Sequence, residues 1–192
     1  GAGGDEARHI LAEGYIAGTE VALEGLLEGG RLTPLALFDK PDPMEGPFFE
    51  ETIYLTPSRL PEVVQRSITA ATQRAAAALG LEDGPVHAEM RIVDGVPWVV
   101  EIAARSIGGL CSRILRFGAG VTLEELILSH ALGLPVPSKE REGRAAGVMM
   151  IPVPRAGKLR QVRGLSDARA VAGIEEVTIS IATGGELVPL PE

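Results

Sequence analysis

Two glutamates, Glu89 and Glu101, have the type and spacing in this sequence that most clearly indicate chemistry. They lie in the segment from His87 to Arg105, where two apolar-rich runs flank an Asp94-Gly95 turn signal, as is typical of a β-hairpin. Two carboxylates held together on a sheet are costly unless a cation neutralises them. The segment therefore indicates a divalent metal site.

The register of this hairpin decides whether the two glutamates share a face. A two-residue turn pairs Val93 with Val96 and puts the two glutamates on opposite faces. A three-residue loop pairs Val93 with Pro97 and places Glu89 opposite Glu101. The apolar pattern favours the three-residue loop, which would put the Cβ atoms of the two glutamates about 5 Å apart, close enough for both carboxylates to reach one metal or two adjacent ones. The alternative is an ordinary solvated salt-bridge surface. In the favoured register the core face carries Met90, Ile92, Trp98, Val100 and Ile102, and the other face carries His87, Glu89, Arg91, Val99, Glu101, Ala103 and Arg105.

Composition excludes several classes of protein. A chain of 192 residues with 45% hydrophobic residues can form a proper core. The net charge of −8 and the 4% aromatic content argue against nucleic acid or an anionic membrane as partner. The single cysteine, Cys111, excludes an internal disulfide, and no signal peptide or membrane-length apolar run is evident. We therefore expect a cytoplasmic protein with neither a nucleic-acid nor a membrane partner.

The pattern of apolar residues and turn signals predicts an α+β fold, with a mainly antiparallel sheet flanked by helices. The predicted strands are 9–13, 19–27, 31–38 and 50–55, followed by the hairpin. The predicted helices are 58–79, capped by Ser58 and stopped by Gly80, then 110–117, and 123–132 with a Thr122–Glu125 capping box. We expect residues 1–8 to be a linker or a cut end, 9–137 the main domain, and 138–192 a small β-rich unit with strands 145–153 and 177–181 and a helix at 166–172.

Four motifs together resemble the ATP-grasp enzymes, and most closely their carboxylate–amine ligase branch, which includes the L-amino acid ligases. The motifs are AEGYIAGTEV at residues 12–21, His87-Ala88-Glu89, the run from Glu101 to Arg105, and Gly108-Gly109. The resemblance covers the chain from about residue 10 and implies an ATP-grasp C-terminal subdomain at 9–137 with a β-rich appendage. The N-terminal region of such an enzyme, with its phosphate-binding lysine and glycine-rich loop, is expected outside this chain, which alone should bind ATP weakly and be inactive.

The resemblance also implies the chemistry and the residues that perform it. Such enzymes phosphorylate a carboxylate with ATP and let an amine attack the acylphosphate, so the implied cofactors are ATP and Mg²⁺, with Mn²⁺ as an alternative, and the substrates are a small carboxylate and a small amine such as amino acids. The implied metal ligands are Glu89 and Glu101, and the implied catalytic residue is Arg105, on a phosphate group. The nucleotide residues would be Glu13, Tyr15 and Ile16 at the adenine hinge and Glu20 at the ribose; His87, Gly108, Gly109 and Lys40 are weaker substrate candidates.

One departure from the family pattern leaves alternatives open. Ala103 stands where these enzymes usually carry an asparagine that binds metal. His87, opposite Ala103 in the favoured register, would compensate in part unless it points into the apolar core. A biotin-carboxylase-like or purine-biosynthesis ligase, and a non-catalytic binding domain with this fold, remain the alternative functions, and a homodimer remains open.

Overall fold

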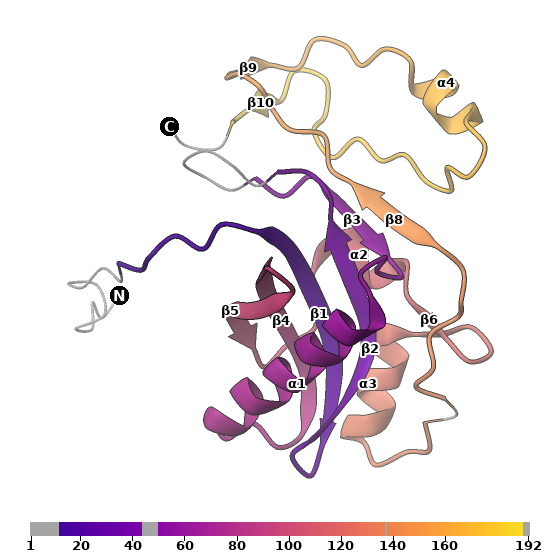
Figure 1. Ribbon diagram of the computed structural model, residues 1–192. Coiled ribbons are helices and arrows are strands. Elements are labelled where there is room, and N and C mark those ends of the chain that lie inside the picture. The colour runs from indigo at the N-terminus through magenta and orange to yellow at the C-terminus, as the bar shows by residue number, and fades with distance from the viewer. Residues whose placement is uncertain (1–11, 44–49, 137, 190–192) are drawn as a thin grey trace, which may run out of the picture. The chain divides into compact units, whose positions relative to one another are not determined.

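The computed structural model describes residues 12–43, 50–136 and 138–189 (Figure 1). The chain divides into two compact units. Unit 1 comprises residues 1–43 and 53–148, and unit 2 comprises residues 44–52 and 149–192. Within the described ranges, no helix combines the length and the apolarity that crossing a membrane requires.

Unit 1 is built on a six-stranded sheet with the strand order β5-β4-β1-β2-β3-β8. The β1–β2, β1–β4, β2–β3 and β4–β5 pairs are all antiparallel. Together with its flanking helices, the sheet confirms the predicted α+β class. The strands of unit 1 are β1 (Thr19–Glu28), β2 (Arg31–Lys40), β3 (Ile53–Thr56), β4 (Gly84–Val93), β5 (Val96–Ala103), β6 (Arg116–Phe117), β7 (Val121–Thr122) and β8 (Ala146–Met149).

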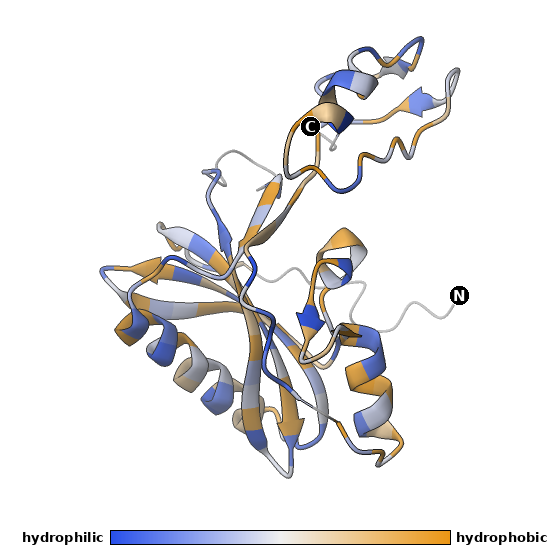
Figure 2. Cartoon of the chain, turned by 90° about the vertical axis from the view of Figure 1, so that its right-hand side faces the viewer, coloured by the Kyte–Doolittle hydropathy of each residue, from blue (hydrophilic) through white to orange (hydrophobic). Residues whose placement is uncertain are grey.

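The two faces of the sheet differ, because side chains alternate along each strand. On β1 the odd-numbered residues, such as Leu23, join an apolar cluster with helix α1 (Glu62–Ala78). The even-numbered residues are mixed: Ala22 and Leu26 belong to a second cluster with α2 (Gly109–Arg113) and α3 (Leu123–Ala131). Figure 2 shows α1 on one side of the sheet and α2 and α3 on the other. The polar residues of the second face therefore lie within a face that is otherwise part of the core.

The caps of the helices are partly as predicted. The predicted Thr122–Glu125 capping box on α3 is confirmed in both directions. Gly80 follows the last turn of α1 with φ of 69°, as a helix stop requires. The predicted Ser58 cap is wrong, because α1 begins after Pro61, and the Ser58 hydroxyl instead donates a hydrogen bond to Asp39.

Other predicted boundaries need correction. Residues 9–11 of the first predicted strand lie outside the described residues, and residues 12 and 13 are not in a strand. The strand predicted at 50–55 begins only at Ile53. The helix predicted at 110–117 is the five-residue α2, after which β6 pairs with β7. Gly118 and Gly120, in the turn between β6 and β7, both have positive φ, which a helix cannot accommodate.

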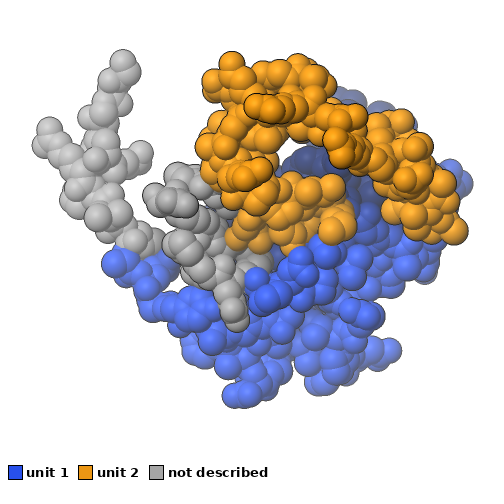
Figure 3. Space-filling view, turned by 90° about the horizontal axis from the view of Figure 1, so that it is seen from above, with its two compact units in different colours: residues 1–43, 53–148 blue, residues 44–52, 149–192 orange. Residues whose placement is uncertain are grey.

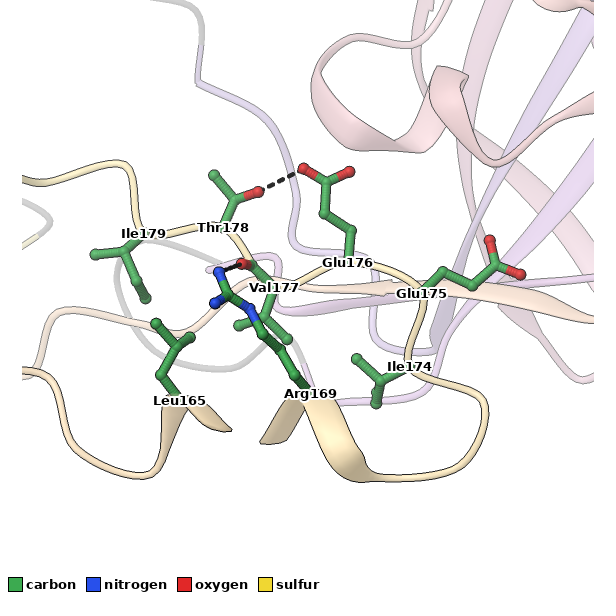
Figure 4. A pocket seen from close by; sticks show the side chains of 8 residues that line it. All are labelled: Leu165, Arg169, Ile174, Glu175, Glu176, Val177, Thr178 and Ile179. Atoms are coloured by element: carbon green, nitrogen blue, oxygen red, sulfur yellow. Dashed lines mark hydrogen bonds between the residues drawn. The ribbon is translucent and has the colours of Figure 1, made fainter. Parts of the chain in front are cut away.

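Unit 2, orange in Figure 3, contains little regular structure in its described residues. The strand predicted at 177–181 is not formed. Arg169 donates a hydrogen bond to the carbonyl of Val177, and both residues line a pocket of this unit (Figure 4). None of the described residues of this unit is buried. Packing holds the side chains of a site in place, and among the described residues only those of unit 1 are buried in this way. The elements of unit 2 are β9 (Gly157–Lys158), α4 (Leu165–Ala170) and β10 (Glu186–Leu187).

Candidate functional site

The β4–β5 hairpin places Glu89 directly opposite Glu101, as predicted, but by a different route. The turn has two residues, Asp94 and Gly95, both with positive φ, and it pairs Val93 with Val96. The predicted three-residue loop is therefore wrong. A β-bulge next to Glu89 supplies the missing residue, because β5 contributes one more residue than β4 at that point.

The bulge also changes what β5 exposes. Met90 on β4 is fully buried, as predicted, but Trp98 and Val100 on β5 are 54% and 50% exposed. The predicted core face is thus wrong for Trp98 and Val100 on this edge strand, whereas Ile102 packs against the core cluster as predicted. Glu101 on the same strand is also half exposed, whereas Glu89 on the neighbouring inner strand is only 16% exposed.

Lys40 lies at the centre of a group of charged side chains on the second face of the sheet. Its Nζ atom is 2.8 Å from Oε1 of Glu20 and 2.7 Å from Oε1 of Glu89. It also lies 5.0 Å from the ring centroid of Tyr54, within the range of a cation–π interaction. Lys40 and Glu20 are both buried. This lysine, predicted as a weak substrate residue, therefore bridges carboxylates from β1 and β4.

Glu24 and His87 form a second pair beside Lys40. Glu24 is 1% exposed and contacts Nδ1 of His87 through one oxygen. Its other oxygen accepts a hydrogen bond of 2.9 Å from the backbone N–H of Ile107. The Nε2 atom of His87 lies 3.4 Å from Oε1 of Glu89. His87 therefore points onto the polar face, opposite Ala103 as predicted, but both of its ring nitrogens already face carboxylates.

These contacts determine the charges of the group. Burial disfavours the charged imidazole, but the hydrogen bonds and charges of Glu24 and Glu89 outweigh it and raise the pKa of His87 to about 9. The hydrogen bond from His87 lowers the pKa of Glu89 to about 2, because together with the Lys40 ammonium it outweighs the opposite effect of burial. Burial raises the pKa of Glu24, although His87 acts in the opposite direction. Near neutral pH, His87 is consequently an imidazolium between carboxylates.

Arg91 joins this group to the predicted adenine hinge. Its Nε atom is 3.0 Å from Oε2 of Glu20. Its terminal nitrogen donates to the hydroxyl of Tyr15 at 3.0 Å and to the carbonyl of Ile16 at 3.1 Å, and the guanidinium lies 5.2 Å from the Tyr15 ring centroid. Three of the four predicted nucleotide residues are thereby held together, and the fourth, Glu13, is exposed in the same segment.

Gly18 ends this hinge at a position that only glycine fits. Its φ is 151°, and a Cβ atom there would lie 2.4 Å from the carbonyl oxygen of Ile92. We expect Gly18→Ala to lower the free energy of unfolding by about 2 kcal/mol or more, because backbone strain and a backbone clash add together. Urea denaturation measures this change. Gly14→Ala is the matched control, because it lies in the same segment but has nothing within 4 Å of the added carbon. Its free energy of unfolding should differ from that of the parent chain by no more than about 0.5 kcal/mol. Equal effects of the two substitutions would contradict the close approach of Gly18 to Ile92.

Arg105 and the Gly108-Gly109 turn lie beyond the end of β5. A terminal nitrogen of Arg105 is 3.4 Å from Oε1 of Glu101, and the side chain is 54% exposed. Gly108 and Gly109 begin α2, as predicted for a turn before a helix, but α2 has only five residues. The backbone N–H of Ile107 is already bonded to Glu24. This hydrogen bond ties the loop that carries Arg105 to β1.

The donor atoms of the group fit a hard cation. Oxygens of Glu20 and Glu89 lie within 4.8 Å of one another, and Glu101 faces Glu89 across the hairpin. Carboxylate oxygens suit Mg²⁺ or Mn²⁺. Ala103, opposite His87, adds no donor.

Sequence reasoning missed the importance of Glu24. A signal was present, because Glu24 lies four residues after Glu20 in a strand that is otherwise largely apolar, and the period of a strand puts both on one face. A charged residue at the centre of such a strand is buried and hence needs a partner. The identity of that partner, His87, depends on the β1–β4 pairing, which the sequence does not specify.

Comparison with known proteins identifies the family. A family model described as an ATP-grasp domain matches residues 4–114. The alanine–anticapsin ligase of Bacillus subtilis (strain 168) is 32% identical over 117 residues, which cover 60% of this chain and 24% of that protein. The crystal structure of an L-amino acid ligase from Bacillus licheniformis matches with a TM-score of 0.77 and 33% identity, covering 93% of this chain and 44% of that one.

A more distant structure agrees in fold. Phosphoribosylglycinamide synthetase from Anaerococcus prevotii matches with a TM-score of 0.66 at 15% identity, covering 90% of this chain and 44% of that chain. The chain thus spans less than half the length of each of these relatives. The match of the family model over more than half of the chain, and the fold shared with these structures, show that the chain belongs to the ATP-grasp family, on its amino acid ligase branch.

Proposed function

We propose that this chain forms the C-terminal part of the nucleotide and metal site of an ATP-dependent carboxylate–amine ligase that joins amino acids or similar small acids and amines. The pairing of Glu89 with Glu101, with Arg105 beside Glu101, is the observation that carries the proposal. The identity of about one third to an alanine–anticapsin ligase and an L-amino acid ligase supports this substrate class over those of purine-biosynthesis ligases.

The reaction has two steps. A carboxylate oxygen of the acid attacks the γ-phosphorus of ATP, and ADP leaves, which gives an acylphosphate. The amine nitrogen then attacks the acyl carbon; the C–O bond to phosphate breaks, inorganic phosphate leaves, and the nitrogen loses a proton as the amide forms. Both steps gather negative charge on oxygen, and a bound Mg²⁺ would supply positive charge that neutralises part of it. In this proposal Glu89 and Glu101 hold that metal, and the guanidinium of Arg105 binds a phosphate group.

The proposed nucleotide contacts are on the hinge. Backbone groups from Glu13 to Tyr15 would bond the edge of the adenine, and Ile16 would line the slot for its ring. Glu20 already accepts from Lys40 and Arg91. A carboxylate has about four acceptor positions, so ribose hydroxyls remain compatible with these two bonds.

Glu101→Gln is the substitution that tests this function. We expect the chain to bind a non-hydrolysable ATP analogue in a Mg²⁺-dependent manner, and the substitution to weaken the Mg²⁺-dependent part at least about tenfold, because loss of an anionic ligand removes a charge-assisted contact worth about 1.5 kcal/mol or more. Isothermal titration calorimetry with and without Mg²⁺ measures the change. Glu62→Gln, which removes a carboxylate that is 90% exposed on α1, is the control and should leave the affinity unchanged.

A non-catalytic binding domain is the alternative that Ala103 favours, since alanine offers no ligand where the family usually has asparagine. Unaltered analogue binding by the Glu101→Gln variant, or no effect of Mg²⁺ on the parent chain, would reject the proposed site. For turnover, we propose that the chain needs the remainder of a longer enzyme, since its relatives are more than twice as long. Product formation by this chain alone, with equivalent consumption of ATP, would disprove that dependence.

A further inference from the structure

Lys40 occupies the place between two carboxylates where a divalent cation would be expected. Its ammonium lies within 2.8 Å of oxygens from both Glu20 and Glu89, and the side chain is 2% exposed. Tyr54, which is also buried, lies beneath it. A lysine so placed is held by the fold from several directions and is not a surface side chain that moves freely aside.

Each of the two carboxylates that Lys40 bridges also has a second cationic partner. Glu20 has Arg91 as its second cation, and Glu89 has His87. A free divalent ion that approached Glu20 and Glu89 would meet the positive charge of Lys40 at close range, and would have to displace its hydrogen bonds. Carboxylates that already have cationic partners attract a further cation weakly.

A nucleotide changes this balance. The polyphosphate of ATP brings several negative charges and many acceptor oxygens, to which both a divalent metal and a lysine ammonium can bind. With a polyphosphate present, the metal and Lys40 have separate anionic partners and need not compete for the same two carboxylates.

We infer that Lys40 is a built-in counter-ion that excludes free divalent metal from the Glu20–Glu89 pair, so that metal binds in company with the nucleotide. The first part, exclusion by Lys40, follows from the ion pairs of unit 1. The second part, dependence on nucleotide, rests on the proposed function.

Lys40→Met tests the exclusion, because methionine keeps the length of the side chain and removes its charge. With Mn²⁺ as the probe and no nucleotide present, electron paramagnetic resonance should show at least tenfold tighter binding by the variant than by the parent chain. Mn²⁺ should also raise the thermal midpoint of the variant more than that of the parent, because it binds the folded state of the variant preferentially. Adding Glu89→Gln to Lys40→Met should abolish the gain.

Two control variants separate charge from side-chain loss. Lys40→Arg keeps the positive charge and should show no gain. Lys139→Met removes the lysine that pairs with Glu28 elsewhere in unit 1, and should also show none. Tighter Mn²⁺ binding by either control variant than by the parent chain overturns the inference. Mn²⁺ binding by the Lys40→Met variant that is no tighter than that of the parent chain also overturns it.

The parent chain provides a test that needs no variant. It should bind Mn²⁺ weakly alone and at least tenfold more tightly with a non-hydrolysable ATP analogue; tight binding of Mn²⁺ alone overturns the inference even if every Lys40 variant fails to fold. Failure of the analogue to bind rejects the proposed nucleotide site and the second part of the inference. The nucleotide-free comparison still decides whether Lys40 excludes metal.

Discussion

Replacing Glu24 by alanine is expected to lower the free energy of unfolding by about 3 to 5 kcal/mol at neutral pH, because it removes one partner of a buried charged pair. The imidazolium of His87 would lose its main counter-ion, and the backbone N–H of Ile107 would lose its acceptor inside the core. Chemical denaturation followed by circular dichroism measures the loss.

The same strand offers the matched control. Glu28, four residues after Glu24, pairs with Lys139 but is 45% exposed, so Glu28→Ala should cost no more than about 1 kcal/mol. Glu24→Gln keeps an oxygen acceptor, so its loss of unfolding free energy should lie between those of Glu24→Ala and Glu28→Ala. If Glu24→Ala proved as mild as Glu28→Ala, the Glu24–His87 pair would stabilise the fold no more than the exposed Glu28–Lys139 pair does.

Raising the pH from 6.5 to 9 is expected to remove up to about 3 kcal/mol of stability from the metal-free chain. The pKa of His87 is raised from 6.5 to about 9 in the fold. A raised pKa means that the folded state binds the proton more tightly than the unfolded state. Its contribution is therefore complete below pH 6.5 and is lost as the pH rises through 9. Unfolding measured in the presence of EDTA, at intervals across this range, gives the slope.

His87→Gln should remove most of that slope, because glutamine does not titrate. His130→Gln should leave it in place, since His130 lies at the surface of α3, 3.7 Å from the half-exposed Glu28. A parent chain whose stability is constant between pH 6.5 and 9 would show that His87 is neutral in the fold.

The β4–β5 hairpin shows how far sequence reasoning reaches. Asp94-Gly95 is a strong signal for a two-residue turn, and that is the turn that forms. The apolar pattern nevertheless favours a longer loop, because that register puts the apolar residues of both strands on one core face. A regular ladder after a two-residue turn would also separate Glu89 from Glu101. The bulge resolves the conflict, but a bulge in an edge strand leaves no distinct mark in the sequence, since its residues are solvent-exposed valines.

Long-range pairings explain most of the other differences. Pairs that involve neighbours in sequence, such as the Thr122–Glu125 capping box, were predictable from spacing alone. The bridge by Lys40 joins strands that are adjacent only in space. Local spacing predicts Ser58 as a helix cap, because the partner that it has in the fold, Asp39, lies 19 residues earlier in the chain.

The bulge beside Glu89 also has a consequence for association between molecules. β5 is the outermost strand on its side of the sheet and exposes Val96, Trp98, Val99 and Val100, and such an edge can pair with the same strand of another copy. An unpaired residue in the strand breaks the regular row of donors and acceptors, and Pro97 contributes no N–H to it. The irregularity that aligns the two glutamates therefore also makes this edge a poor template for aggregation.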